Sequence, residues 1–157
     1  HGCSRVVVLD LDVHQGDGTA SILEGEDGIT TISVHCKQNF PFRKTDSDYD
    51  LVVEAGSGDD EYLSVIDDAM TIVDRYEPDL ILFQAGVDGL SEDALGRLDL
   101  SREGMRYRNK KVFDYVLERQ VPCVVFMGGG YSNPIDHTVD ALMDLFRGAA
   151  NASLLFS

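Results

Sequence analysis

The sequence lacks the features that would place it outside the class of ordinary globular proteins. It contains no Gly/Ser/Pro-rich linker, no low-complexity tract and no repeat at the periods of solenoid proteins. Its longest apolar runs, such as residues 6–9, have the length of a strand and fall far short of the ~20 residues needed to cross a bilayer. A chain of 157 residues can bury a sizeable core, so we expect a single domain over residues 1–157 and no membrane contact.

Basic residues are also scarce. The sequence has 13 Lys and Arg against 28 Asp and Glu, which gives a formal net charge of −15. Binding to a nucleic-acid backbone requires clustered Lys and Arg, and a surface with this charge repels a duplex. The composition therefore excludes direct nucleic-acid binding and favours cationic or neutral ligands.

Cysteines are few, and their spacing does not indicate pairs. Cys3, Cys36 and Cys123 form an odd set without a C-x-x-C pair, which predicts reduced thiols in a cytosol-like compartment, the cytoplasm or, in a eukaryote, also the nucleus. The sequence begins at His1 rather than Met, and a strand-like run starts almost at once. We therefore expect a fragment that is truncated at its N-terminus.

Four apolar runs that predict strands alternate with helical patterns. The strands are expected at residues 5–12, 29–34, 80–84 and 123–127, and the helices at residues 59–76, 101–120 and 133–148. In the last helix, the spacing predicts that Ile135, Val139, Leu142 and Phe146 face the core and that Gly148 ends the helix. Strands that alternate with helices predict a three-layer α/β fold, a parallel sheet with helices on both faces.

Carboxylates and an imidazole follow the first predicted strand. In an extended chain the side chains of Asp10, Asp12 and His14 project from one face, and Gly16 and Gly18 let the backbone turn. Two oxygen ligands and one nitrogen ligand suit a borderline divalent cation such as zinc, provided that a third protein ligand arrives from elsewhere. The alternative is a polar strand end whose Asp and His side chains cap the following helix.

The ends of the other strands also carry unusual polar residues. Ligands bind beyond the carboxyl ends of the strands in such folds, where residues 33–35, 84–88 and 128–131 are expected to converge. Asp88 is the candidate third ligand, with a helix N-cap as the alternative. Tyr131 follows three glycines and would offer its phenol to an oxyanion, with a half-buried aromatic on a turn as the alternative.

These stretches together resemble a known family. Residues 10–19 (DLDVHQGDGT), 33–35 (SVH), 84–88 (QAGVD) and 128–131 (GGGY) are similar to four motifs of the zinc-dependent histone deacetylase superfamily, which includes bacterial acetylpolyamine and acetoin-utilisation relatives. Gln15 stands where many members have a second histidine, a feature that resembles the class IV type and its bacterial kin. The resemblance extends from residue 5 to about residue 145 and implies the C-terminal part of a deacetylase-type catalytic domain with the arginase/deacetylase-like fold.

The resemblance implies a role for particular residues. Zn²⁺ would be held by Asp12, His14 and Asp88, and Tyr131 would donate to the oxyanion that forms when water attacks the carbonyl of an acetylated lysine side chain, peptide or polyamine. Asp10 and Asp17 would orient a pair of catalytic histidines.

Two further sites follow from the same resemblance. A structural monovalent cation, usually K⁺, would be bound by Asp10 and by the main-chain carbonyls of Asp12, His14, Ser33 and Val34. A narrow tube for the acylated side chain would be lined by Phe40, Leu95 and Gly129, although ordinary loop packing is the alternative for Phe40.

The sequence departs from the family at one point. In the family the histidine pair precedes the first zinc-binding strand, whereas here that strand starts at Arg5, and His1 cannot supply the pair. His35 and His137 are predicted to be structural. We therefore expect zinc binding without appreciable activity of the chain alone. A non-catalytic metal-stabilised domain and an arginase-like hydrolase with two manganese ions stay open, as does oligomerisation through an exposed sheet edge.

Overall fold

Strands and helices alternate along the chain in the computed structural model, which describes residues 2–156. Their order and bounds are β1 (Val6–Asp10), α1 (Asp17–Leu23), β2 (Ile29–Cys36), β3 (Tyr49–Val53), α2 (Asp59–Tyr76), β4 (Leu80–Gln84), α3 (Arg102–Arg119), β5 (Cys123–Phe126) and α4 (Asp136–Leu155). No helix within these residues combines the length and the apolar character that a membrane span requires.

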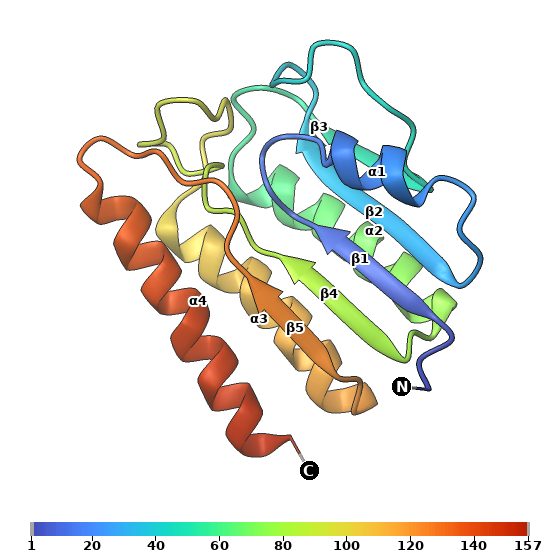
Figure 1. Cartoon of the computed structure of the whole chain (residues 1–157). Coiled ribbons are helices and arrows are strands. Elements are labelled where there is room, and N and C mark those ends of the chain that lie inside the picture. Colours follow the sequence, from blue (N-terminus) through green and yellow to red (C-terminus); the bar gives the residue numbers. More distant parts are fainter. Residues whose placement is uncertain (1, 157) are drawn as a thin grey trace.

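The strands form one parallel sheet in the order β3-β2-β1-β4-β5. Helices α2 and α3 cover one face of the sheet, α1 lies over the other, and α4 packs against α3 beside β5 (Figure 1). The predicted three-layer α/β fold is therefore confirmed. Because every strand runs in the same direction, all of their carboxyl ends lie at one edge of the sheet.

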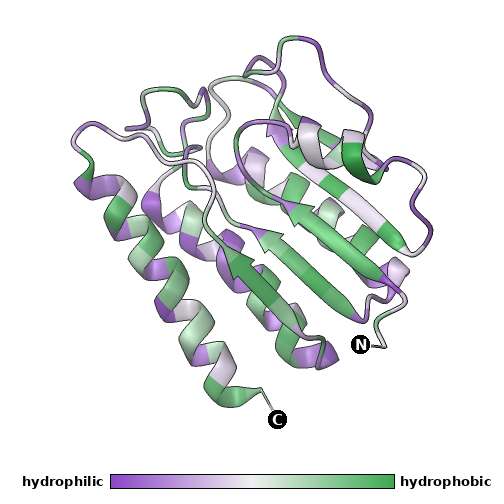
Figure 2. Cartoon of the chain, viewed as in Figure 1, coloured by the Kyte–Doolittle hydropathy of each residue, from purple (hydrophilic) through white to green (hydrophobic). Residues whose placement is uncertain are grey.

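The core lies between the sheet and helices α2 and α3. Figure 2 shows β1, β4 and β5 as hydrophobic ribbons, and β1 is buried at every position from Val7 to Asp10. Helix α2 has the bounds predicted from its apolar spacing and buries Tyr62, Ile66, Ala69 and Val73. Helix α3 begins after Ser101, whose hydroxyl accepts a hydrogen bond from the backbone N–H of Gly104, as expected of an N-cap.

The prediction for the last helix is wrong in phase and in length. Helix α4 continues through Gly148 to Leu155 and buries Thr138, Ala141, Leu145 and Ala152. Ile135, Val139 and Phe146 are exposed rather than inward-facing, and Leu142 is only partly buried. Apolar residues occur on two faces of this helix, so its hydrophobic spacing alone does not identify the face that packs on α3.

Two elements were not predicted, and three strands differ in length from those expected: β1 and β5 are shorter, and β2 extends to Cys36. Strand β3 has exposed and acidic residues because it lies at the edge of the sheet, and α1 is a short helix with only Ala20 buried. Strand β1 ends at Asp10, so Asp12 and His14 lie in the following bend rather than on an extended strand. The alternating-face argument for these two residues is therefore wrong, and a different local geometry brings them together.

Candidate metal centre at the carboxyl edge of the sheet

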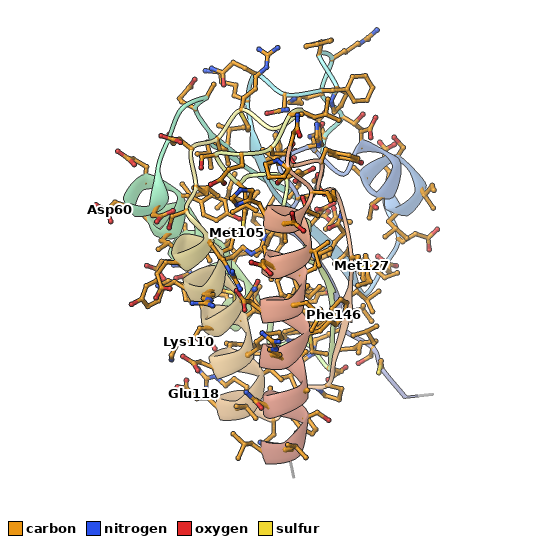
Figure 3. The ribbon with its side chains drawn as sticks, turned by 90° about the vertical axis from the view of Figure 1, so that its left-hand side faces the viewer. Asp60, Met105, Lys110, Glu118, Met127 and Phe146 are labelled. Carbon is orange, nitrogen blue, oxygen red and sulfur yellow. The ribbon has the colours of Figure 1, made fainter. Side chains whose placement is uncertain are left out.

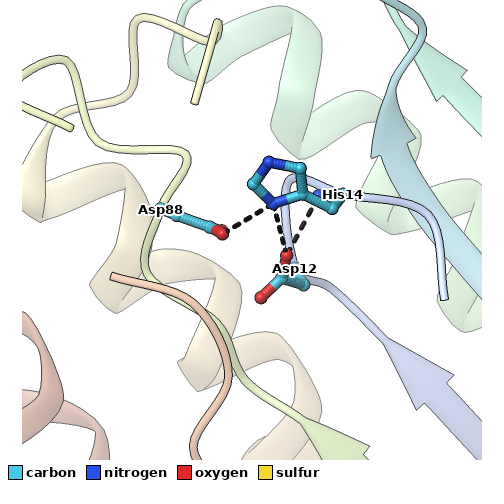
Figure 4. A group of neighbouring side chains, drawn as sticks. All are labelled: Asp12, His14 and Asp88. Carbon is cyan, nitrogen blue, oxygen red and sulfur yellow. Dashed lines mark hydrogen bonds and ion pairs between the residues drawn. The ribbon is translucent and has the colours of Figure 1, made fainter. Parts of the chain in front are cut away.

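The side chains of Asp12, His14 and Asp88 meet at this edge of the sheet (Figure 4). His14 Nδ1 lies 3.1 Å from Asp12 Oδ1 and 3.0 Å from Asp88 Oδ2. One ligand atom from each residue lies within 4.8 Å of the others. Asp88 is fully buried, and Asp12 is nearly so. Two residues from the loop after β1 and one from the loop after β4 therefore form a compact cluster, as predicted.

Hydrogen bonds from backbone N–H groups to side-chain carboxylates shape the bend after β1. The carboxylate of Asp10 accepts the N–H of Asp12, and the carboxylate of Asp12 accepts the N–H of His14. Each aspartate thus closes a turn onto the residue two positions later, a conformation that aspartate favours. Asp88 Oδ1 accepts the N–H of Val13 at 2.9 Å and ties the two loops together. The bend, and not a strand, aims the cluster inward.

The alternative helix-capping roles do not fit the structure. Gly16 is the N-cap of α1, and no side chain caps that helix. Asp88 lies in the loop after β4, far along the chain from the start of α3 at Arg102. Neither Asp12 nor Asp88 therefore caps a helix, and capping does not explain why these residues lie at the ends of the strands.

The cluster attracts positive charge. Hydrogen bonds to Asp12 and then to Asp88 raise the pKa of His14 to about 10. Burial favours the neutral form of Asp12, yet the hydrogen bonds from His14 and Gly129 outweigh it and lower the pKa of Asp12 to about 2. Burial raises the pKa of Asp88 to about 6 and that of Asp10 to about 7. A cation placed among these carboxylates would relieve the cost of burying them.

The donor set fits a divalent metal ion. Two ligands bound at about 2.0 Å to a tetrahedral zinc ion lie about 3.3 Å apart. The separations of 3.0 and 3.1 Å between His14 Nδ1 and the two carboxylate oxygens are close to this spacing. Two carboxylates and one imidazole leave a coordination position open, which is typical of catalytic rather than structural zinc sites.

Three consecutive glycines after β5 bring the backbone against the cluster. The backbone N–H of Gly129 donates to Asp12 Oδ2 at 2.6 Å. A Cβ on Gly129 would lie 1.9 Å from Asp88 Oδ2, and one on Gly128 would lie 2.6 Å from Asp12 Oδ2. Side chains at these positions would displace the carboxylates, so the glycines allow the backbone to approach the cluster closely.

The predicted site residues line two neighbouring pockets. A pocket of about 350 Å³ is lined by Asp10, Asp12, His14, Asp17, Phe40, Asp88, Gly129 and Tyr131, together with other residues. A second, of about 330 Å³, adjoins it at His14, Phe40 and Tyr131 and adds Leu95. The phenol of Tyr131 is half-exposed and has no hydrogen-bond partner among residues 2–156. Phe40 is exposed and packs edge-on against Phe42.

Three residues of the predicted potassium site, Asp10, Ser33 and Val34, lie on the neighbouring strands β1 and β2. Ser33 of β2 stands directly opposite Asp10 of β1 in the sheet, and Val34 follows it. All three residues are buried. The carboxylate of Asp10 accepts the N–H of Asp12 and makes no ion pair within the described residues.

The histidine pair expected beside the cluster has no counterpart within residues 2–156. His35 is buried, shares a hydrogen bond with Ser33, and has an Nε2 atom without a partner. His137 is partly exposed near Glu92. Asp10 and Asp17 form no hydrogen bond with a described histidine. His1 lies outside the described residues.

Sequence reasoning missed the contacts that several polar residues make around the cluster. Asn39 Nδ2 lies 3.3 Å from His14 Nε2 and also donates to the carbonyl of Leu95. Gln84 donates to Asp12 Oδ2 at 3.4 Å, and Gln15, which lines the same pocket, donates to the carbonyl of Thr45 and to Asp50 Oδ1. The position of Gln84 at the end of a buried strand could have predicted its contact with the cluster. Asn39 lies in a loop, and no sequence pattern indicated its contact with His14.

Fold and site together define a class of protein. A parallel α/β sheet carries a cluster of two carboxylates and one imidazole, open to a pocket, where such folds bind ligands. The model of the histone deacetylase domain matches residues 1–145, and the chain therefore belongs to the histone deacetylase family.

Relatives by sequence agree with this assignment. The chain is 38% identical over 136 residues to an uncharacterized protein of Picosynechococcus, which covers 86% of the chain and 45% of that protein. It is 34% identical over 149 residues to histone deacetylase 2 of Arabidopsis thaliana, covering 92% of the chain and 38% of that protein. The chain thus spans less than half the length of these relatives.

Solved structures show the same fold. The acetylpolyamine aminohydrolase of Burkholderia pseudomallei superposes with a TM-score of 0.80 at 23% identity, over 93% of this chain and 45% of that one. A histone deacetylase homolog complexed with SAHA gives a TM-score of 0.75 at 26% identity, over 94% of this chain and 42% of that one. The recognition of the superfamily from its motifs is confirmed.

Proposed function

We propose that the chain is the C-terminal portion, as a single domain over residues 1–157, of a zinc-dependent hydrolase that removes acetyl or other acyl groups from amines. The observation that carries the proposal is the cluster of Asp12, His14 and Asp88 beside a pocket at the carboxyl edge of the sheet. Family membership supports hydrolysis of an acetyl amide, such as acetyl-lysine in a peptide or an acetylpolyamine.

In this proposal Asp12, His14 and Asp88 hold the zinc ion. Bound there, zinc would lower the pKa of water and polarise the acyl carbonyl. The hydrogen bonds from Gly129 and Val13 hold the carboxylates of Asp12 and Asp88 in place. Asn39 faces the other ring nitrogen of His14 and fixes the orientation of the imidazole.

Tyr131 supplies the donor for the reacting carbonyl. Its phenol hydroxyl borders both pockets and is not engaged by a neighbouring side chain within the described residues. A phenol hydroxyl is a hydrogen-bond donor and can donate to a developing oxyanion. Phe40, Leu95 and Gly129 form the wall along which the acylated side chain enters.

Asp10 and Asp17 complete the proposed machinery. Their carboxylates border the pocket without a histidine partner among residues 2–156, and we propose that they orient a histidine pair that takes the proton from water. Asp10, together with main-chain carbonyls of Asp12, His14, Ser33 and Val34, is proposed to bind K⁺, which would offset the cost of the buried Asp10 carboxylate.

Metal analysis of the purified chain tests the ligand set. We expect one zinc ion per chain, and we expect Asp88→Ala to lose it because a buried ligand is removed. Asp68→Asn, an exposed change on α2, is the matched control and should bind zinc like the wild type. A wild-type chain that binds no zinc would refute the assignment.

Turnover separates an enzyme from a binding module. We expect the 157-residue chain alone to show no appreciable hydrolysis of a fluorogenic acetyl-lysine substrate, because loss of a general base costs ~10²–10⁴-fold. The complete gene product that carries this chain should hydrolyse the substrate in a zinc-dependent way. If it binds zinc and the acetylated peptide but releases no acetate, the protein is the non-catalytic binding domain.

A further inference from the structure

A fully buried arginine lies directly beneath the metal centre. Arg108 of α3 is the largest side chain in the structure that is entirely enclosed. Its guanidinium Cζ lies 5.8 Å from the centre of the Phe83 ring on β4. An arginine is almost never fully buried without a partner that repays its lost hydration, so its position calls for a specific role.

The guanidinium bonds to main-chain carbonyls of the two loops that carry the cluster. Arg108 Nη1 donates to the carbonyl of Leu11 at 3.2 Å and to that of Gly86 at 2.6 Å. Leu11 directly precedes Asp12, and Gly86 lies two residues before Asp88. A single nitrogen atom therefore joins the backbone segments that position the two carboxylate ligands.

These bonds occur where the sheet ladder stops. Strands β1 and β4 are paired up to Asp10 and Gln84, and the N–H of Leu11 still donates to the carbonyl of Gln84. Beyond this point the strand pairing does not continue, and Leu11 and Gly86 are buried. Without Arg108 these acceptors would lose their donor in a dry environment, which is costly.

The neighbours of Arg108 fix its own orientation. Asn109 Oδ1 accepts from Nε at 3.1 Å and from Nη2 at 2.9 Å. No carboxylate within residues 2–156 is hydrogen-bonded to Arg108, so its charge is not consumed by an ion pair. The planar guanidinium is thus held by the side chains of Asn109 and the buried Tyr62 and aimed at two carbonyls, a geometry that a lysine cannot reproduce fully.

We infer that Arg108 is a positioning residue of the metal centre: it fixes the loops after β1 and β4 at the spacing at which Asp12 and Asp88 bind one metal ion. The inference rests on the proposed zinc site and adds a residue that touches neither the metal ion nor the substrate. Outer residues that orient metal ligands change metal affinity by about 10- to 100-fold when they are removed.

The test measures zinc affinity of the whole chain by competition with a chromophoric chelator, with the folded fraction checked by circular dichroism. Arg108→Met keeps much of the apolar bulk and removes all the donors, and it should weaken zinc binding about 10- to 100-fold. Arg108→Lys should recover part of the loss because one ammonium group can reach a carbonyl. The absorption spectrum of bound Co²⁺ should change in Arg108→Met, since it reports ligand geometry.

Arg106→Met is the matched control on the same helix. Arg106 is exposed and paired with Asp144, away from the cluster. Its loss should lower stability and leave zinc affinity and the Co²⁺ spectrum unchanged. A folded Arg108→Met variant with wild-type zinc affinity, or an equal loss of affinity in Arg106→Met, overturns the inference.

The inference can still be tested if Arg108→Met does not fold. If Arg108→Met is unfolded, Asn109→Ala replaces it, because this change removes the acceptor that orients the guanidinium and should loosen its contacts with the two carbonyls. Weakened zinc binding in Asn109→Ala and in Arg108→Lys supports the inference, and wild-type affinity in both refutes it. If the wild-type chain binds no zinc, the proposed function itself is refuted. This outcome is seen before any variant is measured, so it is distinct from failure of the inference.

Discussion

At the scale of single residues, Asp12 has little freedom to move. Its Oδ1 accepts from the N–H and the ring of His14, and its Oδ2 accepts from the N–H of Gly129 and from Gln84. A Cβ on Gly86 would lie 2.1 Å from the same Oδ2. The absence of a side chain at Gly86 is therefore part of the metal centre, because the carboxylate occupies that volume.

Gly86→Ala should disrupt the centre while the sheet persists. The added methyl group would push the Asp12 carboxylate out of place, and we expect zinc affinity to fall roughly 10- to 100-fold, as for other changes that misplace a ligand. Titration calorimetry with zinc measures the loss.

Gly18→Ala is the control, because no atom lies within 4 Å of its new Cβ. Gly18 lies within α1, where alanine should add ~0.5–1 kcal/mol of stability. Equal zinc affinity in both variants would contradict this account.

At the scale of elements, ion pairs join the two outer helices. Arg102 Nε and Arg106 Nε of α3 lie 2.5 and 2.9 Å from Asp144 Oδ2 of α4. Hydrogen bonds from Arg102, opposed by partial burial and reinforced by Arg106, lower the pKa of Asp144 to about 2. Because α3 is the main neighbour of α4, these pairs help to determine which face of α4 meets α3.

Asp144→Asn should destabilise the protein at neutral pH. The pKa of Asp144 is lower in the folded chain, so its contribution is present above about pH 4 and is lost as the pH falls towards 2. We expect a loss on the order of 1 kcal/mol, because the arginines are half-exposed and solvent screens the pairs. Urea unfolding at pH 7 and pH 3 measures the difference from wild type, which should shrink at pH 3. Asp68→Asn is the control, because Asp68 has no ion pair among the described residues, and it should change the free energy of unfolding little at either pH. A loss of stability in Asp144→Asn that is the same at both pH values would contradict the ion-pair explanation.

At the scale of the molecule, one side is apolar and open. Strand β5 forms an edge of the sheet and exposes Val124 and Phe126, and Met127 follows it. Figure 3 labels Met127 and, on α4, Phe146; Val139 of α4 is exposed as well. The opposite edge, β3, is flanked by acidic residues. Open apolar edges recruit further strands or other molecules, whereas charged edges resist them.

We expect the isolated chain to associate through the β5 edge as its concentration rises. Val124→Lys should reduce this association, because a charge on an edge strand blocks pairing. Light scattering coupled to size-exclusion chromatography measures it. Val52→Lys, a half-exposed position on β3, is the matched control and should behave like the wild type. A wild-type chain that stays monomeric at all concentrations would refute the expectation.

The sequence by itself determined the class of fold and the identity of the cluster. Buried parallel strands leave long apolar runs, and polar residues after such runs fall at one edge of the sheet, so Asp12, His14 and Asp88 could be brought together before the structure was known. Only the tertiary structure decided how they are held. The bend after β1, the face of α4, and the contacts of Asn39 and Arg108 depend on which loops and helices become neighbours. That information lies in packing between distant segments, and local periodicity does not record it.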